Sequence, residues 1–259
     1  MTNYIYLLFG SKDIFYVEAA YSIGTLLRRI DRRSSRIIVF TDQPERIKTW
    51  PVICEPIADD LEAMQSPTRY IHRPKMCVIL RCLERYSGNV VYFDSDTFVS
   101  GNLEALSQKL DRGTAIMNLF EGKNPVPELA GFHTTLSGNQ DYSYSRDSVM
   151  YNSGVVGLHQ DHRQLVAHAL ELCDALQAVV PHVRTVEQFA ISEMLRLADA
   201  RVLSSRGVAV HYIKAKHYVR PQIFKMMAET GKQPWEFDRS IPYWYPAIKV
   251  MKFFGKYTS

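Results

Sequence analysis

The hydrophobic and polar positions of the chain alternate between short apolar runs and longer stretches in which apolar side chains recur at helical spacing. The apolar runs, each bounded by a turn, predict strands at Tyr4–Phe9, Arg36–Phe40 and Val90–Phe93. The periodic stretches predict helices at 14–30 and 74–86. Because strands and helices alternate from the first residues, we expect an α/β fold with a mainly parallel central sheet flanked by helices.

The run Phe120–Met150 breaks this alternation. It combines glycines, prolines and a polar cluster and shows no clear period. Because a long segment without regular structure inside a compact domain is usually functional, we expect a lid or binding loop here. Beyond it, the pattern predicts a strand at Val149–Leu158, helices at about 161–178 and 186–198, and a last apolar run at Val208–Tyr212.

The composition of the 259 residues, 46% apolar and 22% charged, is that of an ordinary globular protein and excludes collagen, coiled coil and wholesale disorder. No apolar stretch reaches the roughly 18 residues of a membrane-spanning helix. We expect no secretory signal, since the first residues lack a basic region. The four cysteines lie far apart, which favours a reducing, cytoplasmic compartment over a disulfide framework or a structural zinc site.

Positive charge gathers in the last fifth of the chain. The net charge is +4, and residues 208–259 hold nine Lys and Arg against three acidic residues. Within them, 241–257 mixes aromatic side chains with lysines, which suits the interface of an anionic membrane. Packing of the aromatic side chains onto the domain explains the same pattern, and both interpretations stay open. We expect no nucleic-acid partner, because no nucleic-acid motif accompanies the lysines.

The sharpest chemical feature is the pair Asp94 and Asp96 at the end of the strand predicted at Val90–Phe93. In an extended chain, residues i and i+2 point to the same side, so both carboxylates can face one cation, and such oxygen ligands suit Mg²⁺ or Mn²⁺. A solvated turn or a helix N-cap is the plain alternative. The dehalogenase-type phosphatase pattern fits less well, since Phe98 stands where that pattern has Thr.

Three further motifs follow along the chain. Asn152, Ser153 and Gly154 precede an apolar run, Glu187-Gln188 opens a predicted helix, and His211 ends the last apolar run. Each alone is more often structural than catalytic: a turn, a first-turn acid beside the helix dipole, and a strand entering a solvated basic loop. Their order along the chain, after the two aspartates, is more specific.

In this order the motifs resemble the GT-A glycosyltransferases, above all glycosyltransferase family 8, the galactosyl-, glucosyl- and glycogenin-like group. The resemblance spans about residues 4–217 and implies a GT-A catalytic domain at 1–217 with a C-terminal extension at 218–259. It implies that Asp94, Asp96 and His211 hold Mn²⁺ (or Mg²⁺) on the diphosphate of a UDP-sugar.

The resemblance also implies the remaining site residues. It assigns the catalytic region to Asn152, Glu187 and Gln188. The donor-binding residues it implies are Phe9, Gly10, Ser11, Tyr16, Asp42, Lys75, Asp94, Ser95, Lys214 and Lys216. The family's late Gly and Lys-Pro-Trp are missing here, so the choice between Lys214 and Lys216 as the diphosphate contact stays open, and the ring of Tyr16 stacks on the base or belongs to the core. Glu187 replaces the family's Asp, and because an inverting transfer needs a carboxylate base in this place, Glu187 keeps inversion open beside the retention that the family implies.

The function these features imply is metal-dependent transfer of a hexose from a UDP-sugar to a glycan or lipid-linked acceptor, with retention of configuration. Polysaccharide or lipopolysaccharide biosynthesis, in the cytoplasm and peripherally on the inner face of the membrane, fits this chemistry. A GT-A-like protein that only binds nucleotide sugars or glycans is the alternative. A nucleotidyltransferase fits less well, because no Gly-rich phosphate loop follows the first strand.

Overall fold

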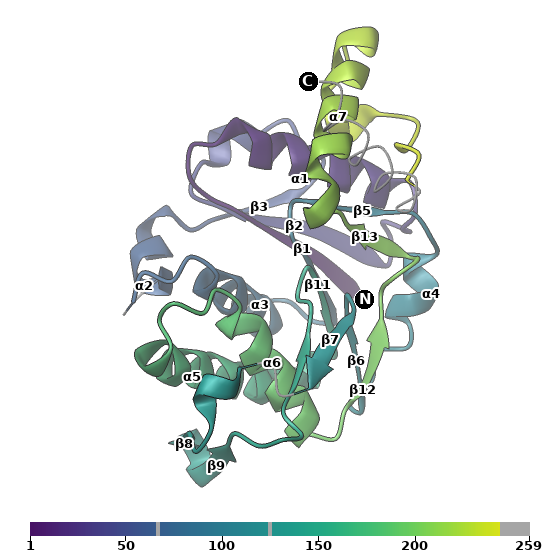
Figure 1. Cartoon of the computed structure of the whole chain (residues 1–259). Helices are drawn as coiled ribbons and strands as arrows, with labels where there is room; N and C mark the ends of the chain where they lie inside the picture. Colours follow the sequence, from purple (N-terminus) through teal and green to yellow (C-terminus); the bar gives the residue numbers. More distant parts are fainter. Residues whose placement is uncertain (66–67, 124–125, 244–259) are drawn as a thin grey trace, which may run out of the picture.

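A mixed seven-stranded sheet forms the centre of the computed structural model, which describes residues 1–65, 68–123 and 126–243 (Figure 1). The strand order is β12-β6-β11-β4-β1-β2-β3. The strands are β1 (Thr2–Leu8), β2 (Ser35–Thr41), β3 (Ile53–Pro56), β4 (Asn89–Phe93), β6 (Thr114–Met117), β11 (Val155–Leu158) and β12 (Arg201–Ser204). Neighbouring strands are parallel except that β11 runs antiparallel to both β4 and β6.

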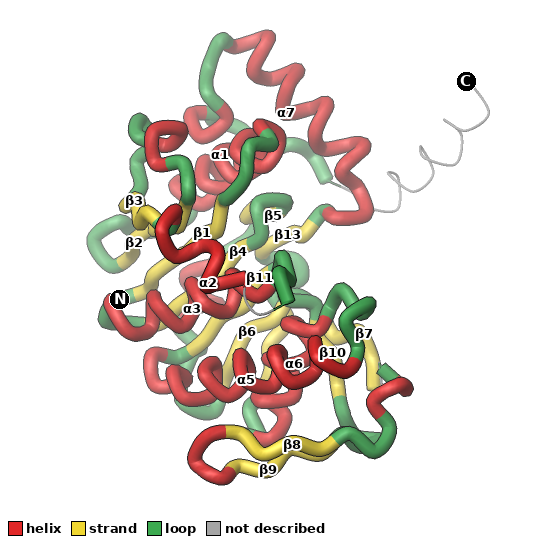
Figure 2. The backbone as a smooth tube through the Cα atoms, turned by 90° about the vertical axis from the view of Figure 1, so that its left-hand side faces the viewer, coloured by secondary structure: helices red, strands yellow, loops and turns green. Residues whose placement is uncertain are grey.

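Successive side chains of the central strands point to opposite faces of the sheet and are buried on both. In β1, Tyr4 and Tyr6 point to one face and Ile5 points to the other, and all three are fully buried. The Tyr4 face packs against α1 (Asp13–Leu27) and α4 (Leu103–Ser107). The Ile5 face packs against α3 (Arg73–Arg85), α5 (Arg163–Val179) and α6 (Val186–Leu197). Figure 2 shows the strands between these two helical layers.

Short paired strands surround the main sheet. β5 (Thr97–Val99) pairs with β13 (Ala209–His211), β7 (Phe120–Lys123) with β10 (Val149–Tyr151), and β8 (His133–Leu136) with β9 (Gln140–Ser143), all antiparallel. The remaining α-helices are α2 (Leu61–Gln65) and α7 (Lys216–Thr230). The pairs β5–β13 and β7–β10 join segments that lie far apart in the sequence, and both border the site described below.

The predicted fold class is confirmed, and the strands and helices that were predicted in the first hundred residues lie within a few residues of their predicted bounds. β3, α2 and β5 in the same region were not predicted. The prediction of a segment without regular structure at Phe120–Met150 is wrong. Its described residues form β7, β8 and β9, and Leu129, Leu136 and Tyr142 are buried in the core. Isolated buried side chains in a polar segment show no period, so the pattern could not predict these strands.

Two further differences concern the second half. The strand predicted at Val149–Leu158 is two strands, β10 and β11, in different sheets, because residues 152–154 turn the chain between them. The basic segment after His211 is not simply a solvated loop, since Lys216–Thr230 form α7, which packs on α1 (Figure 1). There Arg220 donates 3.0 and 3.1 Å hydrogen bonds to the fully buried Glu18.

The C-terminal residues that the structure describes pack on the domain. Phe237 and Ile241 are each 3% exposed, and the ring of Tyr243 lies edge-on to Phe98 with centroids 5.5 Å apart. Residues 244–259, which hold most of the predicted membrane-contacting aromatic and basic side chains, lie outside the described residues. Among the described helices, none is long and apolar enough to cross a membrane. The boundary predicted at 217/218 stays a prediction.

Candidate active site

Five segments meet at one edge of the central sheet because of its topology. The parallel strands β1, β2 and β4 all end at this edge, where α/β folds bind ligands. β11 is antiparallel to β4 and pairs its first residue, Val155, with Phe93, so the turn that precedes β11 lies at the same edge. The pairing of His211 with Thr97 between β13 and β5 adds the imidazole.

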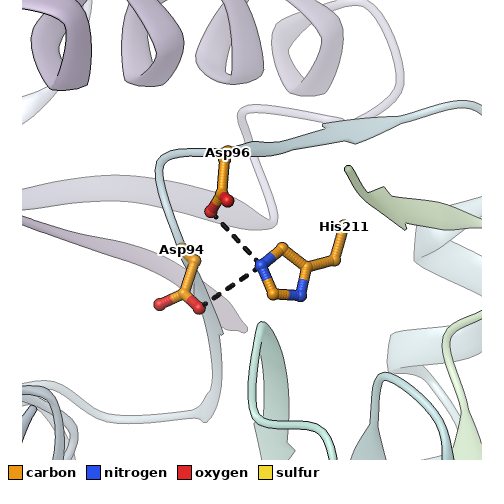
Figure 3. A group of neighbouring side chains, drawn as sticks. All are labelled: Asp94, Asp96 and His211. Carbon is orange, nitrogen blue, oxygen red and sulfur yellow. Dashed lines mark ion pairs between the residues drawn. The ribbon is translucent and has the colours of Figure 1, made fainter. Parts of the chain in front are cut away.

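The two aspartates and the histidine form a compact cluster (Figure 3). Nε2 of His211 lies 3.3 Å from Oδ1 of Asp96 and 3.8 Å from Oδ2 of Asp94. One potential ligand atom from each residue lies within 4.8 Å of the other two. Two carboxylates and one imidazole are ligands that suit Mn²⁺, and the carboxylates also suit Mg²⁺. The chemistry and spacing of this donor set therefore fit a divalent cation.

Gly154 makes room for the histidine of this cluster. A Cβ atom at residue 154 would lie 2.2 Å from Nδ1 of His211 and 2.5 Å from its Cγ, well inside van der Waals contact. Only glycine leaves space for the imidazole at this position. The glycine of the Asn-Ser-Gly motif is therefore explained by close packing against the histidine.

Two lysines form ion pairs with the two aspartates. Nζ of Lys75 lies 3.1 Å from Asp94, and Nζ of Lys216 lies 2.8 Å from Asp96. Burial alone would raise the pKa of Asp96, but the hydrogen bonds and charges of His211 and Lys216 outweigh burial and lower it. Of the two lysines left open by the sequence, Lys216 contacts the cluster, whereas Lys214 is exposed on the 3₁₀ turn Ile213–Ala215.

Lys75 is a buried cation surrounded by acceptors. It is 5% exposed, and its Nζ lies 3.4 Å from Glu187 and 3.0 Å from Oγ of Ser153. Burial disfavours its charge, but Asp94 and Glu187 outweigh burial and raise the pKa of Lys75. This lysine therefore stays charged and joins α3, β4 and α6 beneath the cluster.

Glu187 is fully engaged by neighbouring donors. It is 4% exposed, accepts a 3.2 Å hydrogen bond from Oγ of Ser153 and a short one from the hydroxyl of Tyr70. The sequence did not indicate Tyr70 or assign a role to Ser153. Tyr70 lies in a segment without periodic signal, and Ser153 carried no signal beyond its place between Asn152 and Gly154.

Asn152 and Gln188 both donate hydrogen bonds to the carboxylate of Glu121, a residue that the sequence did not indicate. Glu121 on β7 accepts a 3.1 Å hydrogen bond from Nδ2 of Asn152 and a 2.6 Å hydrogen bond from Nε2 of Gln188. Oδ1 of Asn152 lies 2.9 Å from Nδ1 of His211. Glu121 falls in the segment predicted to lack regular structure, and no local pattern connects it with residues 31 and 67 positions away.

The predicted donor residues at the ends of β1 and β2 are connected with each other. The backbone N–H of Gly10 donates a 3.0 Å hydrogen bond to Asp42, and Gly10 has the left-handed φ of 80° that glycine adopts readily. Phe9 and Gly10 are half-buried, and Ser11 is exposed. Ser95, between the two aspartates, is half-buried.

Tyr16 belongs to the core in this structure. It is 4% exposed, and the guanidinium of Arg46 lies 3.7 Å from the centroid of its ring. Its hydroxyl lies 3.5 Å from Asp42. Of the two interpretations that the sequence left open, core packing describes the ring, because Arg46 covers one of its faces.

Comparison with solved structures shows the fold. No protein-family model matches the chain, and no curated protein matches it in sequence. The galactosyltransferase LgtC, solved in complex with donor and acceptor sugar analogs, is 12% identical, with a TM-score of 0.51 over 79% of this chain and 74% of that chain. Mouse xyloside xylosyltransferase 1 in its apo form is 15% identical, with a TM-score of 0.50 over 79% and 86%. The chain therefore has the GT-A glycosyltransferase fold.

Proposed function

We propose that this protein transfers a hexose from a UDP-sugar to a glycan or lipid-linked acceptor, in a reaction that depends on Mn²⁺ or Mg²⁺. The observation that carries this proposal is the convergence of Asp94, Asp96 and His211 at the carboxyl edge of a GT-A sheet. Asp94 and Asp96 lie in the turn that follows β4, and His211 ends β13, more than a hundred residues later. A solvated turn or a helix cap would not require that convergence.

The leaving group of such a transfer is a nucleoside diphosphate, whose developing negative charge is the main electrostatic demand. Asp94, Asp96 and His211 would hold the cation, which when bound supplies positive charge to the diphosphate. Lys216 is the second source of positive charge, since its side chain is 31% exposed and its ammonium already lies at the cluster. Lys216 therefore donates to a phosphate oxygen, as a point charge without fixed geometry.

The sugar end of the site consists of the amides of Asn152 and Gln188. A retaining transfer needs no carboxylate base beside the acceptor hydroxyl, whereas an inverting one does. Glu187 is the residue that kept inversion open, but it is buried and bound by Lys75, Tyr70 and Ser153. This engagement supports retention, with Gln188 as the amide nearest the reacting carbon.

Release of UDP from UDP-glucose and UDP-galactose tests the proposal, with Mn²⁺ or EDTA, for the wild type and Asp96→Asn. We expect release that requires Mn²⁺ and falls by about two to three orders of magnitude in Asp96→Asn. Asp59→Asn, at an exposed aspartate of the same chain, is the matched control and should behave as the wild type.

Two other outcomes would count against transfer. Tight, Mn²⁺-dependent binding without turnover, in the presence of a panel of glycan and lipid-linked acceptors, would favour the alternative of a nucleotide-sugar-binding protein. The absence of any metal-dependent binding of either UDP-hexose would overturn the assignment of the site itself.

A further inference from the structure

Glu121 is a carboxylate that none of the roles above uses. It lies on β7 and is exposed, yet both of its oxygens are engaged by side-chain amides. The partners come from different elements, Asn152 from the turn between β10 and β11 and Gln188 from the first turn of α6. An ionised carboxylate only accepts hydrogen bonds, so each amide must present its NH₂ group to Glu121.

The backbone fixes the same two amides from their other ends. The N–H of Gly154 donates to Oδ1 of Asn152 at 3.0 Å, and the N–H of Ser153 donates to Oε1 of Gln188 at 3.3 Å. A backbone N–H only donates, so each side-chain oxygen must face it. Glu121 on one side and the backbone on the other therefore require the same orientation of both amides.

The orientation of Asn152 has a consequence for the histidine of the cation cluster. Oδ1 of Asn152 only accepts, so Nδ1 of His211, 2.9 Å away, carries the proton and donates it. A neutral imidazole has a single ring proton, which leaves the lone pair on Nε2. Nε2 is the nitrogen that faces Asp94 and Asp96 (Figure 3).

We propose that Glu121 is a positioning residue that acts through Asn152 to hold His211 in the tautomer that binds a divalent cation, and that fixes the amide of Gln188 at the same time. The inference rests on the proposed function in naming Mn²⁺ as the cation. Among the described residues, Glu121 forms hydrogen bonds with Asn152 and Gln188 and none with the three cation ligands. It completes a relay from carboxylate to amide to imidazole, and such outer partners typically change metal affinity by one to two orders of magnitude.

The test is Mn²⁺ binding to the full chain without nucleotide, measured by calorimetry. We expect Glu121→Ala to weaken binding about tenfold. Glu121→Gln should fall between the wild type and Glu121→Ala, since one amide oxygen can satisfy only one of the two NH₂ groups. Glu128→Ala is the matched control, because Glu128 is an exposed glutamate close by in the sequence, and it should bind Mn²⁺ as the wild type does.

A second measurement separates positioning from general support of the fold. Nitrogen-15 NMR of the metal-free chain reports which imidazole nitrogen of neutral His211 carries the proton, with His211→Gln to assign the signals. We expect Nδ1-protonated His211 in the wild type and a mixture of tautomers in Glu121→Ala. Unchanged Mn²⁺ affinity together with an unchanged tautomer in Glu121→Ala would overturn the proposal.

The two measurements also distinguish this proposal from the function on which it rests. If the wild type binds no Mn²⁺, the proposed metal-dependent transfer fails, and the tautomer in the metal-free chain decides the role of Glu121. If Glu121→Ala does not fold, Glu121→Gln carries both measurements: an Nδ1-protonated fraction equal to that of the wild type then counts against positioning, and a reduced fraction supports it.

Discussion

The two ends of the site are built on different electrostatic principles. At the charged end (Asp94, Asp96, His211, Lys75 and Lys216), two carboxylates face two ammonium groups at 2.8 and 3.1 Å, and the ammonium group of Lys75 also pairs with the buried Glu187. At the amide end (Asn152, Gln188 and Glu121), two neutral amides are oriented by one carboxylate and two backbone N–H groups.

The difference teaches what each end can do. A set of paired charges can exchange one ion for another, because a cation that takes over a carboxylate releases an ammonium group for an anion. Amides that are fixed from both sides cannot exchange partners in this way, but they can present hydrogen-bonding groups in a defined direction. We therefore assign ion binding to the charged end and orientation to the amide end, with His211 as the residue that joins them.

We expect the largest effect from Gly154→Ala, which displaces His211, the residue that joins the two ends. The added Cβ would overlap the imidazole of His211, so the ring must move away from the aspartates. We expect Mn²⁺ affinity to fall about 100-fold and the free energy of unfolding to drop by about 1–3 kcal/mol, as overpacking typically costs. Calorimetry and urea unfolding measure the two effects.

Gly113→Ala is the matched control for this substitution. A Cβ at residue 113 would meet only Oδ1 of Asp111, at an ordinary distance of 3.7 Å. Its Mn²⁺ affinity should equal that of the wild type. Wild-type Mn²⁺ affinity in Gly154→Ala would contradict the placement of His211 in the cation cluster.

The cation cluster around His211 also shows how much of the site can be predicted from the sequence. The spacing of Asp94 and Asp96 at the end of an apolar run predicts their place on the sheet edge, because the alternation of a strand is a local property. The contact of His211 with them depends on the pairing of β13 with β5, and no spacing predicts that partner. The family resemblance, rather than the hydrophobic pattern, named His211 as a ligand.

Neither the hydrophobic pattern nor the family resemblance indicates Glu121. Its segment has no apolar period, and its two amide partners become neighbours only because β7 pairs with β10 and α6 begins beside them. Tyr70 is similar, since its hydroxyl reaches Glu187 across 117 residues. Long-range pairing of single polar side chains leaves no signal in one sequence.

The second prediction concerns Lys75→Met, which removes the buried ammonium group that pairs with Asp94 at the charged end. Lys75→Met leaves Asp94 and the buried Glu187 without their shared cation, in a place where burial makes an unpaired charge costly. We expect the free energy of unfolding to fall by about 3 kcal/mol, at the low end for a broken buried pair because the side chain of Asp94 is 25% exposed. Urea unfolding at neutral pH measures the loss.

Lys48→Met is the control for this loss, since Lys48 is exposed and such substitutions change stability by about 0.5 kcal/mol or less. If Lys75→Met proved as stable as Lys48→Met, the ammonium of Lys75 would not be holding α3, β4 and α6 together.

The third prediction sharpens the idea of ion exchange. In Lys216→Met, Asp96 loses the ammonium at 2.8 Å that competes with a cation. We expect Mn²⁺ to bind about fivefold more tightly without nucleotide, and UDP to bind about fivefold more weakly in the presence of Mn²⁺, as for a partly exposed ion pair. Calorimetric titration with each ligand measures both changes.

Lys214→Met separates the two lysines in the same titrations. Lys214 is exposed, and we expect its loss to change neither affinity. Weaker UDP binding in Lys214→Met, with unchanged binding in Lys216→Met, would transfer the diphosphate contact to Lys214.

The smallest expected effect concerns pH and the imidazole that joins the two ends. Burial disfavours the charged form of His211, but the hydrogen bond and charge of Asp96, with the charge of Asp94, outweigh burial and raise the pKa of His211 above 6.5. Without metal, the ion pair of protonated His211 with Asp96 therefore stabilises the fold below the unfolded-state pKa, and this contribution is lost as the pH rises through the raised pKa.

A bound cation has the opposite dependence, because it needs the neutral imidazole and competes with the proton on Nε2. The rise in melting temperature on adding Mn²⁺ should thus be larger at about pH 8 than at about pH 6, because Mn²⁺ binds more tightly once His211 has lost its proton. His211→Gln should flatten this difference, because it removes the imidazole whose proton competes with the cation. If the Mn²⁺-induced rise in melting temperature became smaller with rising pH, His211 would not be a cation ligand and would interact with Asn152 alone.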